Sequence, residues 1–134
     1  MIRPLRVLET AVYAADLETA ERFYADVLGL LVIGRVEGRH VFFRCGDGVF
    51  LIFNPSATAQ EGGGIPGHGA QGPGHAAFAA ANNDFEAWKT RLAAHGVEIE
   101  SELSWPSGGR SIYFRDPAGN SLELATPRTW GLDG

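Results

Sequence analysis

Two seven-residue stretches decide the fold, and they are Gly38-Arg39-His40-Val41-Phe42-Phe43-Arg44 and Gly109-Arg110-Ser111-Ile112-Tyr113-Phe114-Arg115. Four of the seven positions are identical, and pairing Val with Ile and Phe with Tyr makes six similar. Residues 51–55 match 123–127, and 28–29 match 95–96, in the same order along the chain. Three ordered matches are hard to obtain by chance, so we predict two homologous halves.

The glycine distribution predicts where the halves join. Gly makes up 18 of the 134 residues, and six of these glycines fall between Ser56 and Gly72. We therefore predict a single domain, 1–134, that consists of module one at about 5–55, a glycine-rich connecting loop at 56–72, module two at about 73–127 and a C-terminal tail at 128–134.

The spacing of apolar residues, and the turn and capping residues between apolar segments, predict the same order of helices and strands in each half. Apolar spacing and Asp16, a good N-cap, indicate a first helix that Gly29 ends, and Asn83 or Asp84 would cap a second helix that Gly96 ends. Short β-branched and aromatic runs between turn residues indicate strands. The predicted strands are 7–14, 31–36, 39–45 and 49–54, then 74–81, 97–103, 110–115 and 121–126. The fold class is therefore α+β, with two βαβββ modules.

Charge and composition exclude several classes of partner. The chain has 11 basic and 16 acidic residues, a net charge of −5 and a pI of about 5.3. This deficit argues against nucleic acid and against an anionic membrane surface. A lone cysteine, Cys45, indicates a reducing compartment, and the N-terminus lacks a signal-like apolar run. We therefore expect a soluble cytoplasmic protein with no membrane partner.

Four repeat-equivalent positions carry the candidate chemistry. They hold Glu9, Leu51, His75 and Glu123, and each lies in an otherwise apolar strand. Singly, each polar residue could simply face solvent. Converging inward, two carboxylates would repel each other unless a cation neutralised them. One imidazole and two carboxylates suit Zn, Fe(II), Mn(II) or Ni(II), so we predict one divalent metal ion held by Glu9, His75 and Glu123.

Two motifs resemble the vicinal oxygen chelate superfamily, which includes glyoxalase I, extradiol dioxygenases, fosfomycin-resistance proteins and bleomycin-resistance proteins. The pattern from Asp16 to Gly29 resembles the first helix of that superfamily. The ending Phe114-x-Asp116-Pro117-x-Gly119-Asn120-x-Leu122-Glu123-Leu124 resembles its closing turn and last strand. The resemblance covers roughly 7–127. It implies paired βαβββ modules in a cupped mixed sheet around a central cavity.

The resemblance also implies metal ligands on the first and fourth strands of each module. His75 and Glu123 match common ligands of the family, whereas Glu9 stands where members usually carry His or Gln. Leu51 cannot bind a metal, so the ligand set is similar to the three-ligand sets of dioxygenases and fosfomycin-resistance proteins. Members pair modules across dimers, which makes a homodimer the expected assembly.

Other residues are candidates for substrate binding. The equivalent residues Arg39 and Arg110 could hold a carboxylate or phosphate, or could be plain surface arginines. Tyr113 and Leu51 could line a pocket or belong to the core, and Trp105 could close one edge of the cavity or anchor a dimer.

The sequence suggests no catalytic role for two of the histidines. His40 is expected to be a histidine on the strand surface, and His68 a histidine of a disordered loop rather than part of a lid.

Two main hypotheses for function follow, and a third stays open. In the first, the metal chelates a small oxygen-bearing substrate and stabilises an enolate-like oxyanion, in lyase, isomerase or oxygenase chemistry, with Glu9 or Glu123 as the general base. In the second, the chain is a metal-free protein that sequesters a small molecule, as bleomycin-resistance members do. The third is a structural module whose partner chain performs the chemistry.

Overall fold

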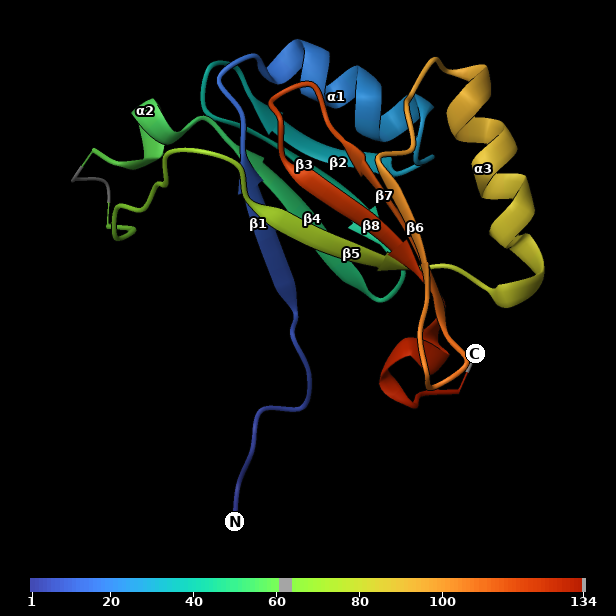
Figure 1. Cartoon of the computed structure of the whole chain (residues 1–134). Helices are drawn as coiled ribbons and strands as arrows, with labels where there is room; N and C mark the ends of the chain where they lie inside the picture. The colour runs from blue at the N-terminus through green and yellow to red at the C-terminus, as the bar shows by residue number, and fades with distance from the viewer. Residues whose placement is uncertain (61–63, 134) are drawn as a thin grey trace. The chain divides into compact units, whose positions relative to one another are not determined.

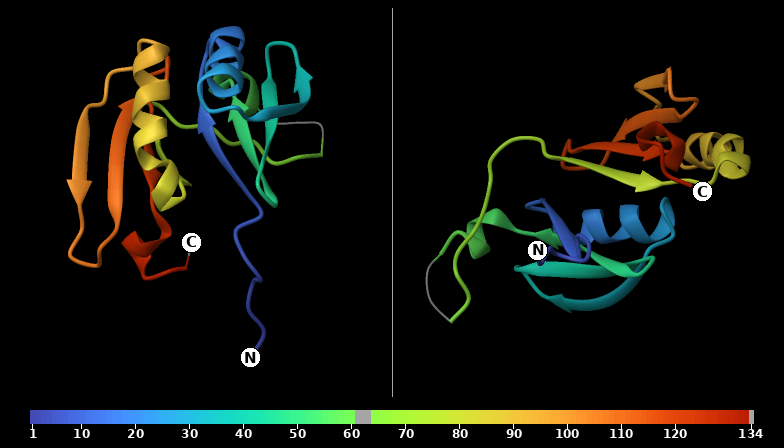
Figure 2. Two further views of the ribbon diagram at one scale, coloured as in Figure 1. Left: turned by 90° about the vertical axis from the view of Figure 1, so that its right-hand side faces the viewer. Right: turned by 90° about the horizontal axis from the view of Figure 1, so that it is seen from below.

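The computed structural model describes residues 1–60 and 64–133 (Figure 1). The chain divides into two compact units, Met1–Gly72 and Pro73–Gly134, and each is described by itself. In each unit the long helix lies across one face of its own sheet (Figure 2).

The first unit contains a four-stranded mixed sheet. Its strands lie in the order β1-β4-β3-β2, with β1 parallel to β4 and the other pairs antiparallel. The elements are β1 (Glu9–Tyr13), α1 (Leu17–Asp26), β2 (Leu31–Val36), β3 (His40–Cys45), β4 (Gly48–Phe53) and the short α2 (Pro55–Thr58).

Helix α1 begins and ends as the sequence predicts. The Asp16 carboxylate accepts the backbone N–H of Thr19 at 3.1 Å, which caps one free donor of the first turn. Gly29, at φ 73°, takes the left-handed conformation that follows the helix. The buried ring of Tyr24 then packs against Phe43 and Phe50, so the helix covers the face of the sheet that carries the core.

The second unit repeats this topology. Its sheet has the order β5-β8-β7-β6, and again the first and last strands of the module pair in parallel. The elements are β5 (His75–Ala79), the 3₁₀ turn η1 (Asn82–Asp84), α3 (Phe85–Ala94), β6 (Ser101–Ser104), β7 (Arg110–Arg115), β8 (Ser121–Ala125) and the 3₁₀ turn η2 (Pro127–Trp130). The core side chains are Phe85, Leu92, Ile112, Phe114, Leu122 and Leu124, all at most 1% exposed.

Several predicted details are wrong at the ends of elements. Asp84 occupies the predicted N-cap position of α3, but a 3₁₀ turn precedes the helix and the Asp84 side chain makes no capping hydrogen bond. The strand predicted at 97–103 begins only at Ser101. The 3₁₀ turn η2 includes the first residues of the predicted tail, whose bounds stay a prediction. Polar residues and the alternation of apolar and polar side chains predict the ends of helices and strands only approximately. A strand ends where its hydrogen-bonded partner strand ends, and the sequence of one strand does not show this.

The described parts of the connecting segment include a short helix where the sequence predicts only a loop. Asn54 accepts the N–H of Ser56 and caps α2, whose first residue is Pro55. A Cβ at Gly67 would lie 3.2 Å from three carbonyl oxygens at the end of this helix. Glycine therefore allows the returning chain to pack directly on α2. Residues 61–63 of the predicted loop lie outside the described part.

The α+β class and the repeated βαβββ order are confirmed. The joint cavity and the single-domain boundaries stay predictions. Within residues 1–60 and 64–133, no helix combines the length and hydropathy that crossing a membrane requires.

Candidate metal-binding face

His75 and Glu123 lie on adjacent parallel strands and face each other. In the register of β5 with β8, His75 is opposite Ser121 and Ala77 is opposite Glu123, so the two side chains emerge from one face of the sheet. His75 Nε2 lies 3.4 Å from Glu123 Oε1. The Glu123 side chain is only 10% exposed, whereas that of His75 is 53% exposed. One buried carboxylate and one accessible imidazole therefore share this face.

The backbone fixes the tautomer of His75. Its Nδ1 lies 2.9 Å from the carbonyl oxygen of Ser121, and a carbonyl can only accept, so Nδ1 carries a proton. In the neutral ring, the lone pair of Nε2 then points towards Glu123. A ring N–H that donates to a backbone carbonyl is the usual support of a metal-binding histidine.

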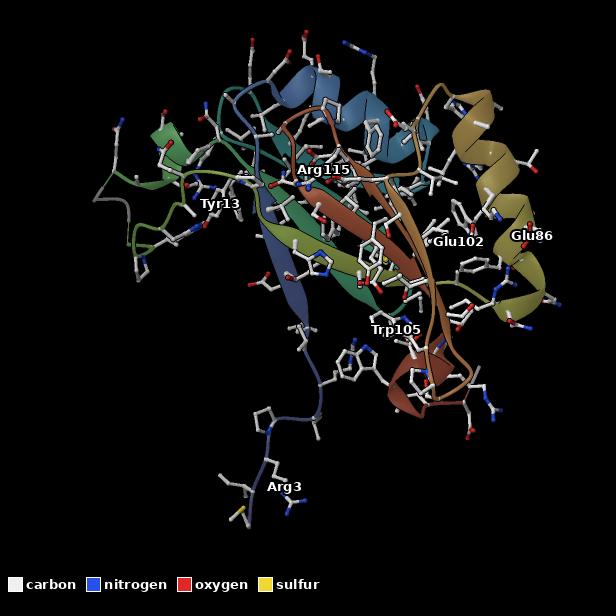
Figure 3. The ribbon with its side chains drawn as sticks, in the orientation of Figure 1. Arg3, Tyr13, Glu86, Glu102, Trp105 and Arg115 are labelled. Atoms are coloured by element: carbon white, nitrogen blue, oxygen red, sulfur yellow. The ribbon has the colours of Figure 1, made fainter. Side chains whose placement is uncertain are left out.

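The second carboxylate oxygen of Glu123 is held from the other side. Ser111, which is fully buried, donates its hydroxyl to Glu123 Oε2 at 2.6 Å. Trp105 in turn donates its indole N–H to Ser111 Oγ at 2.8 Å. Because an indole can only donate, Ser111 must accept there, and its single proton is directed to Glu123. Figure 3 labels Trp105, next to the end of β6.

Tyr113 completes this part of the face. It lies directly opposite Glu123 in the ladder of β7 with β8, and its ring centroid is 6.5 Å from that of His75. Burial raises the pKa of Tyr113, and the nearby charge of Glu123 adds to this effect. The phenol therefore stays protonated at neutral pH and presents a hydroxyl beside the carboxylate.

The His75–Glu123 pair fits a divalent metal. Two donors at about 2.1 Å from one ion lie roughly 3.0–3.4 Å apart at octahedral to tetrahedral angles. The observed separation of 3.4 Å falls in that range. Two electron-rich atoms that face each other are also best stabilised by a cation between them. This arrangement can bind a borderline metal through one nitrogen and one oxygen.

Glu9 lies in the other unit, on β1. There it pairs in register with Val49, and Leu51 follows two residues later on β4. Since His75 and Glu123 have the same relation on β5 and β8, the equivalence of the four positions is confirmed. Leu51 is buried, and Glu9 is exposed. In the described part of the chain, no three His, Cys, Asp or Glu side chains form a cluster that could hold a metal ion, so a role for Glu9 stays a prediction.

The structure does not bring Arg110 to the face that carries His75 and Glu123. Its guanidinium donates to Glu86 Oε1 at 2.6 Å and lies 4.1 Å from the ring centroid of Phe85, and both of these residues belong to α3. Alternation along β7 places Arg110 on the helix side and Ser111 on the opposite side. Figure 3 labels Glu86 on α3 and Glu102 on β6, which is within ion-pair distance of Arg110 at 3.9 Å.

Reasoning from the sequence missed Ser111 as part of this face. A signal was present, because Ser111 is the one clearly dissimilar position between the two heptads, where the first half has His40. Ser111 is also two residues from Tyr113, which is opposite Glu123. Period-two alternation could therefore have placed all three side chains on one face.

Known proteins give an independent view of this arrangement. A structure of lactoylglutathione lyase from Agrobacterium tumefaciens is 42% identical, with a TM-score of 0.92 and coverage of 96% of this chain and 98% of that one. Fosfomycin resistance protein FosX from Mesorhizobium loti is 26% identical, with a TM-score of 0.63 and coverage of 94% and 93%. Glutathione transferase FosA from Serratia marcescens is 32% identical over 92% of this chain and 81% of its own length.

A family model matches residues 6–124, nearly the whole chain, and it is described as the Glyoxalase/Bleomycin resistance protein/Dioxygenase superfamily. The resemblance of the first helix and of the closing turn to that superfamily is thereby confirmed. This match agrees with the structure, in which two βαβββ units have the same order of strands. The chain belongs to the Glyoxalase/Bleomycin resistance protein/Dioxygenase superfamily.

Proposed function

We propose that this chain is a divalent-metal-dependent enzyme of the glyoxalase type that acts on a small oxygen-bearing substrate. The observation that carries the proposal is that His75 Nε2 and Glu123 Oε1 face each other at 3.4 Å. The other polar atom of each group is already hydrogen-bonded, His75 Nδ1 to Ser121 and Glu123 Oε2 to Ser111. The similarity to a lactoylglutathione lyase, at 42% identity, favours lyase or isomerase chemistry next to a carbonyl.

His75, Glu123 and Glu9 are the proposed metal ligands. When bound, a divalent ion would supply Lewis-acid polarisation of the substrate oxygens. Ser111 and Trp105 hold Glu123 Oε2, so Oε1 is the atom left for coordination. This assignment predicts that Glu123 binds through one oxygen.

Glu9 is also the proposed general base, a role in which its carboxylate would no longer coordinate the metal. Its carboxylate makes no hydrogen bond or ion pair with the residues that the structure describes, whereas Glu123 already accepts a short bond from Ser111. A carboxylate that is free to move can take a proton from the carbon next to a carbonyl and return it to the neighbouring carbon. We further propose a single two-module domain that forms a homodimer in the cytoplasm.

Metal content and metal titration test this function. We expect the protein to bind about one Co(II), Ni(II), Mn(II) or Zn(II) per chain in calorimetric titrations. His75→Ala and Glu123→Gln should weaken binding more than about 100-fold, since even residues that only support a ligand can cost ten- to 100-fold. Glu98→Gln, an exposed substitution of the same type, is the matched control.

Activity is tested separately by following the formation and cleavage of lactoylglutathione with the metal-loaded protein. Glu9→Gln should lower the turnover rate more than it lowers metal affinity if Glu9 is the base. An absence of metal binding by the parent protein would contradict the proposal and favour a metal-free protein that sequesters small molecules.

A further inference from the structure

A second group of polar and aromatic side chains lies in the first unit, and the proposed metal chemistry does not use it. We call it the Phe53 cluster, and its members are Tyr13, Arg39, His40, Phe42, Phe53 and His68. The other five members surround the ring of Phe53, at distances from its centroid of 6.4 Å to Tyr13, 5.9 Å to His40, 5.5 Å to Phe42, 4.6 Å to His68 and 5.6 Å to the Arg39 guanidinium. The charged and hydrogen-bonding groups therefore meet over one buried ring.

The register of the sheet explains why these side chains converge. Both Tyr13 on β1 and His40 on β3 pair with Phe53 on β4, so the three side chains share one face at the same level. The ring of Phe42 stacks on that of His40 at 3.9 Å, with an angle of 6° between the planes. Residues from three strands therefore form an aromatic surface on the face of this sheet that is opposite α1.

His68 is brought to the cluster by the connecting segment. Its Nδ1 lies 2.7 Å from the hydroxyl of Tyr13, and its backbone N–H donates to the carbonyl of Thr58 at 2.8 Å. Gly67 and Gly69 on either side pack closely on α2. The expectation of a disordered loop histidine is therefore wrong. Figure 3 labels Tyr13 on the side of β1 that faces this segment.

The Arg39 cation has no countercharge among residues 1–60 and 64–133. Its guanidinium contacts His40 Nδ1 at 2.6 Å and the face of Phe53, and in the described part of the chain no carboxylate lies within ion-pair distance of it. A guanidinium can only donate, so His40 accepts at Nδ1 and its neutral ring carries the proton on Nε2. A half-buried cation that no described carboxylate neutralises, beside N–H donors, is a site that favours an anion.

The Arg39 backbone is fixed before any ligand arrives. Its N–H donates to Val36 at 3.0 Å, and its carbonyl accepts the N–H of Asn54 at 2.8 Å. The Asn54 side chain also donates to Gly38 at 3.1 Å. Fixed main-chain positions reduce the entropy that is lost when a ligand is bound.

The second unit has no such cluster at the equivalent positions. Register places Ala79 where the first unit has Tyr13, Ala125 where it has Phe53, and Ser111 where it has His40. Arg110, the counterpart of Arg39, is neutralised by Glu86. The cluster is therefore a property of one half and not a requirement of the repeated framework.

We propose that the Phe53 cluster binds the anionic group, a carboxylate or a phosphoryl group, of a small organic ligand. The Arg39 guanidinium supplies the charge, and the imidazole and phenol groups supply directed hydrogen bonds. The half-buried ring of Phe42 contacts the apolar part of the ligand, and the buried ring of Phe53 holds the polar groups in place. No member of the Phe53 cluster is a proposed metal ligand, although Glu9, four residues before Tyr13 on β1, shares its face of the sheet. The binding test is therefore made without metal.

The test uses the full chain, treated with a chelator so that metal binding does not contribute. Inorganic phosphate and benzoate are titrated separately at constant ionic strength, with chloride as the reference anion, while the ring resonances of His40 and His68 are followed by NMR. We expect both resonances to shift and to saturate together. Tighter binding of benzoate would assign the site to an aromatic acid, and tighter binding of phosphate would assign it to a phosphoryl group.

Substitutions then separate specific binding from general charge. Arg39→Gln should weaken binding about tenfold or more. Arg35→Gln is the matched control, because Arg35 carries the same charge in the same unit but pairs with Glu21 at 2.9 Å. Tyr13→Phe and His68→Gln should each weaken binding without changing the melting temperature. These two variants test the inference even if Arg39→Gln does not fold. Shifts that do not saturate, or equal losses in Arg35→Gln and Arg39→Gln, would overturn the inference.

Discussion

Asn120 Oδ1 accepts the backbone N–H of Gly74 at 2.7 Å, across 46 residues of sequence. Asn120 is itself held by Asp116, whose Oδ1 accepts the Asn120 backbone N–H at 2.9 Å and whose Oδ2 accepts from its amide at 2.9 Å. The turn between β7 and β8 thereby fixes the residue that precedes His75. This geometry gives a physical reason for the Asp-Pro-x-Gly-Asn turn beside the proposed metal ligands.

Asn120→Ala should destabilise the protein by about 2–4 kcal/mol, because it leaves the buried partners of a two-sided hydrogen-bond network without their contacts. Chemical denaturation followed by circular dichroism measures this change in the free energy of unfolding. Asn83→Ala removes the same type of side chain at an exposed position and should change stability by less than about 0.5 kcal/mol. Equal effects of the two substitutions would contradict the assigned role of Asn120.

Ser111→Ala should weaken metal binding by about ten- to 100-fold without unfolding the protein, because the Glu123 carboxylate loses the hydroxyl that orients it. Trp105→Phe removes only the indole N–H and should have a smaller effect in the same direction. Calorimetry gives the affinities, and the visible spectrum of bound Co(II) reports a change in coordination. Ser101→Ala, at an exposed position on β6, is the control and should leave both measurements unchanged.

His40 should titrate below the ordinary histidine value of about 6.5. Burial lowers the pKa of His40, and the charge of Arg39 lowers it further. The stabilisation associated with the neutral ring is therefore present above about pH 6.5 and is lost as the pH falls through the lower pKa of the folded state. An NMR titration measures the pKa directly. Arg39→Gln should raise it part of the way, whereas a wild-type pKa at or above the ordinary value would contradict the prediction.

Gly109→Ala should destabilise the fold by about 1–3 kcal/mol, because a Cβ at this position would overlap the backbone of Thr129 in η2. Gly34→Ala is the matched control, since open space surrounds a Cβ at Gly34. It should change stability by less than about 0.5 kcal/mol. Thermal melts of the two variants compare the effects, and similar melting temperatures would argue against the close packing of Gly109.

The fold could be predicted from sequence because duplication supplied a second copy of each signal. The alanine-rich β5 has weak strand propensity, yet its place in the repeat identified it correctly. The candidate pair was predicted in the same way, because His75 and Glu123 occupy equivalent strand positions. Contacts that occur in only one half of the repeat were not predictable, and the bond of His68 to Tyr13 is the clearest example.

Arg110 illustrates the opposite limit of sequence reasoning. Its equivalence to Arg39 suggested a shared role, but Glu86 on α3 neutralises only the second-half residue. The repeat conserves the position of the backbone and not the identity of the partner that a side chain meets. Similarity between modules therefore predicts placement better than it predicts chemistry.

The shared strand order of the two units has a consequence for how such a chain can change over time. Leu51 lies on β4 where Glu123 lies on β8, so one codon substitution separates an inert site from a potential donor without any movement of the main chain. Each half can therefore gain or lose a metal-donor side chain while the other half keeps its existing side chains. Ancestral reconstruction or directed evolution could use this spare position to add a ligand to a framework that already tolerates it.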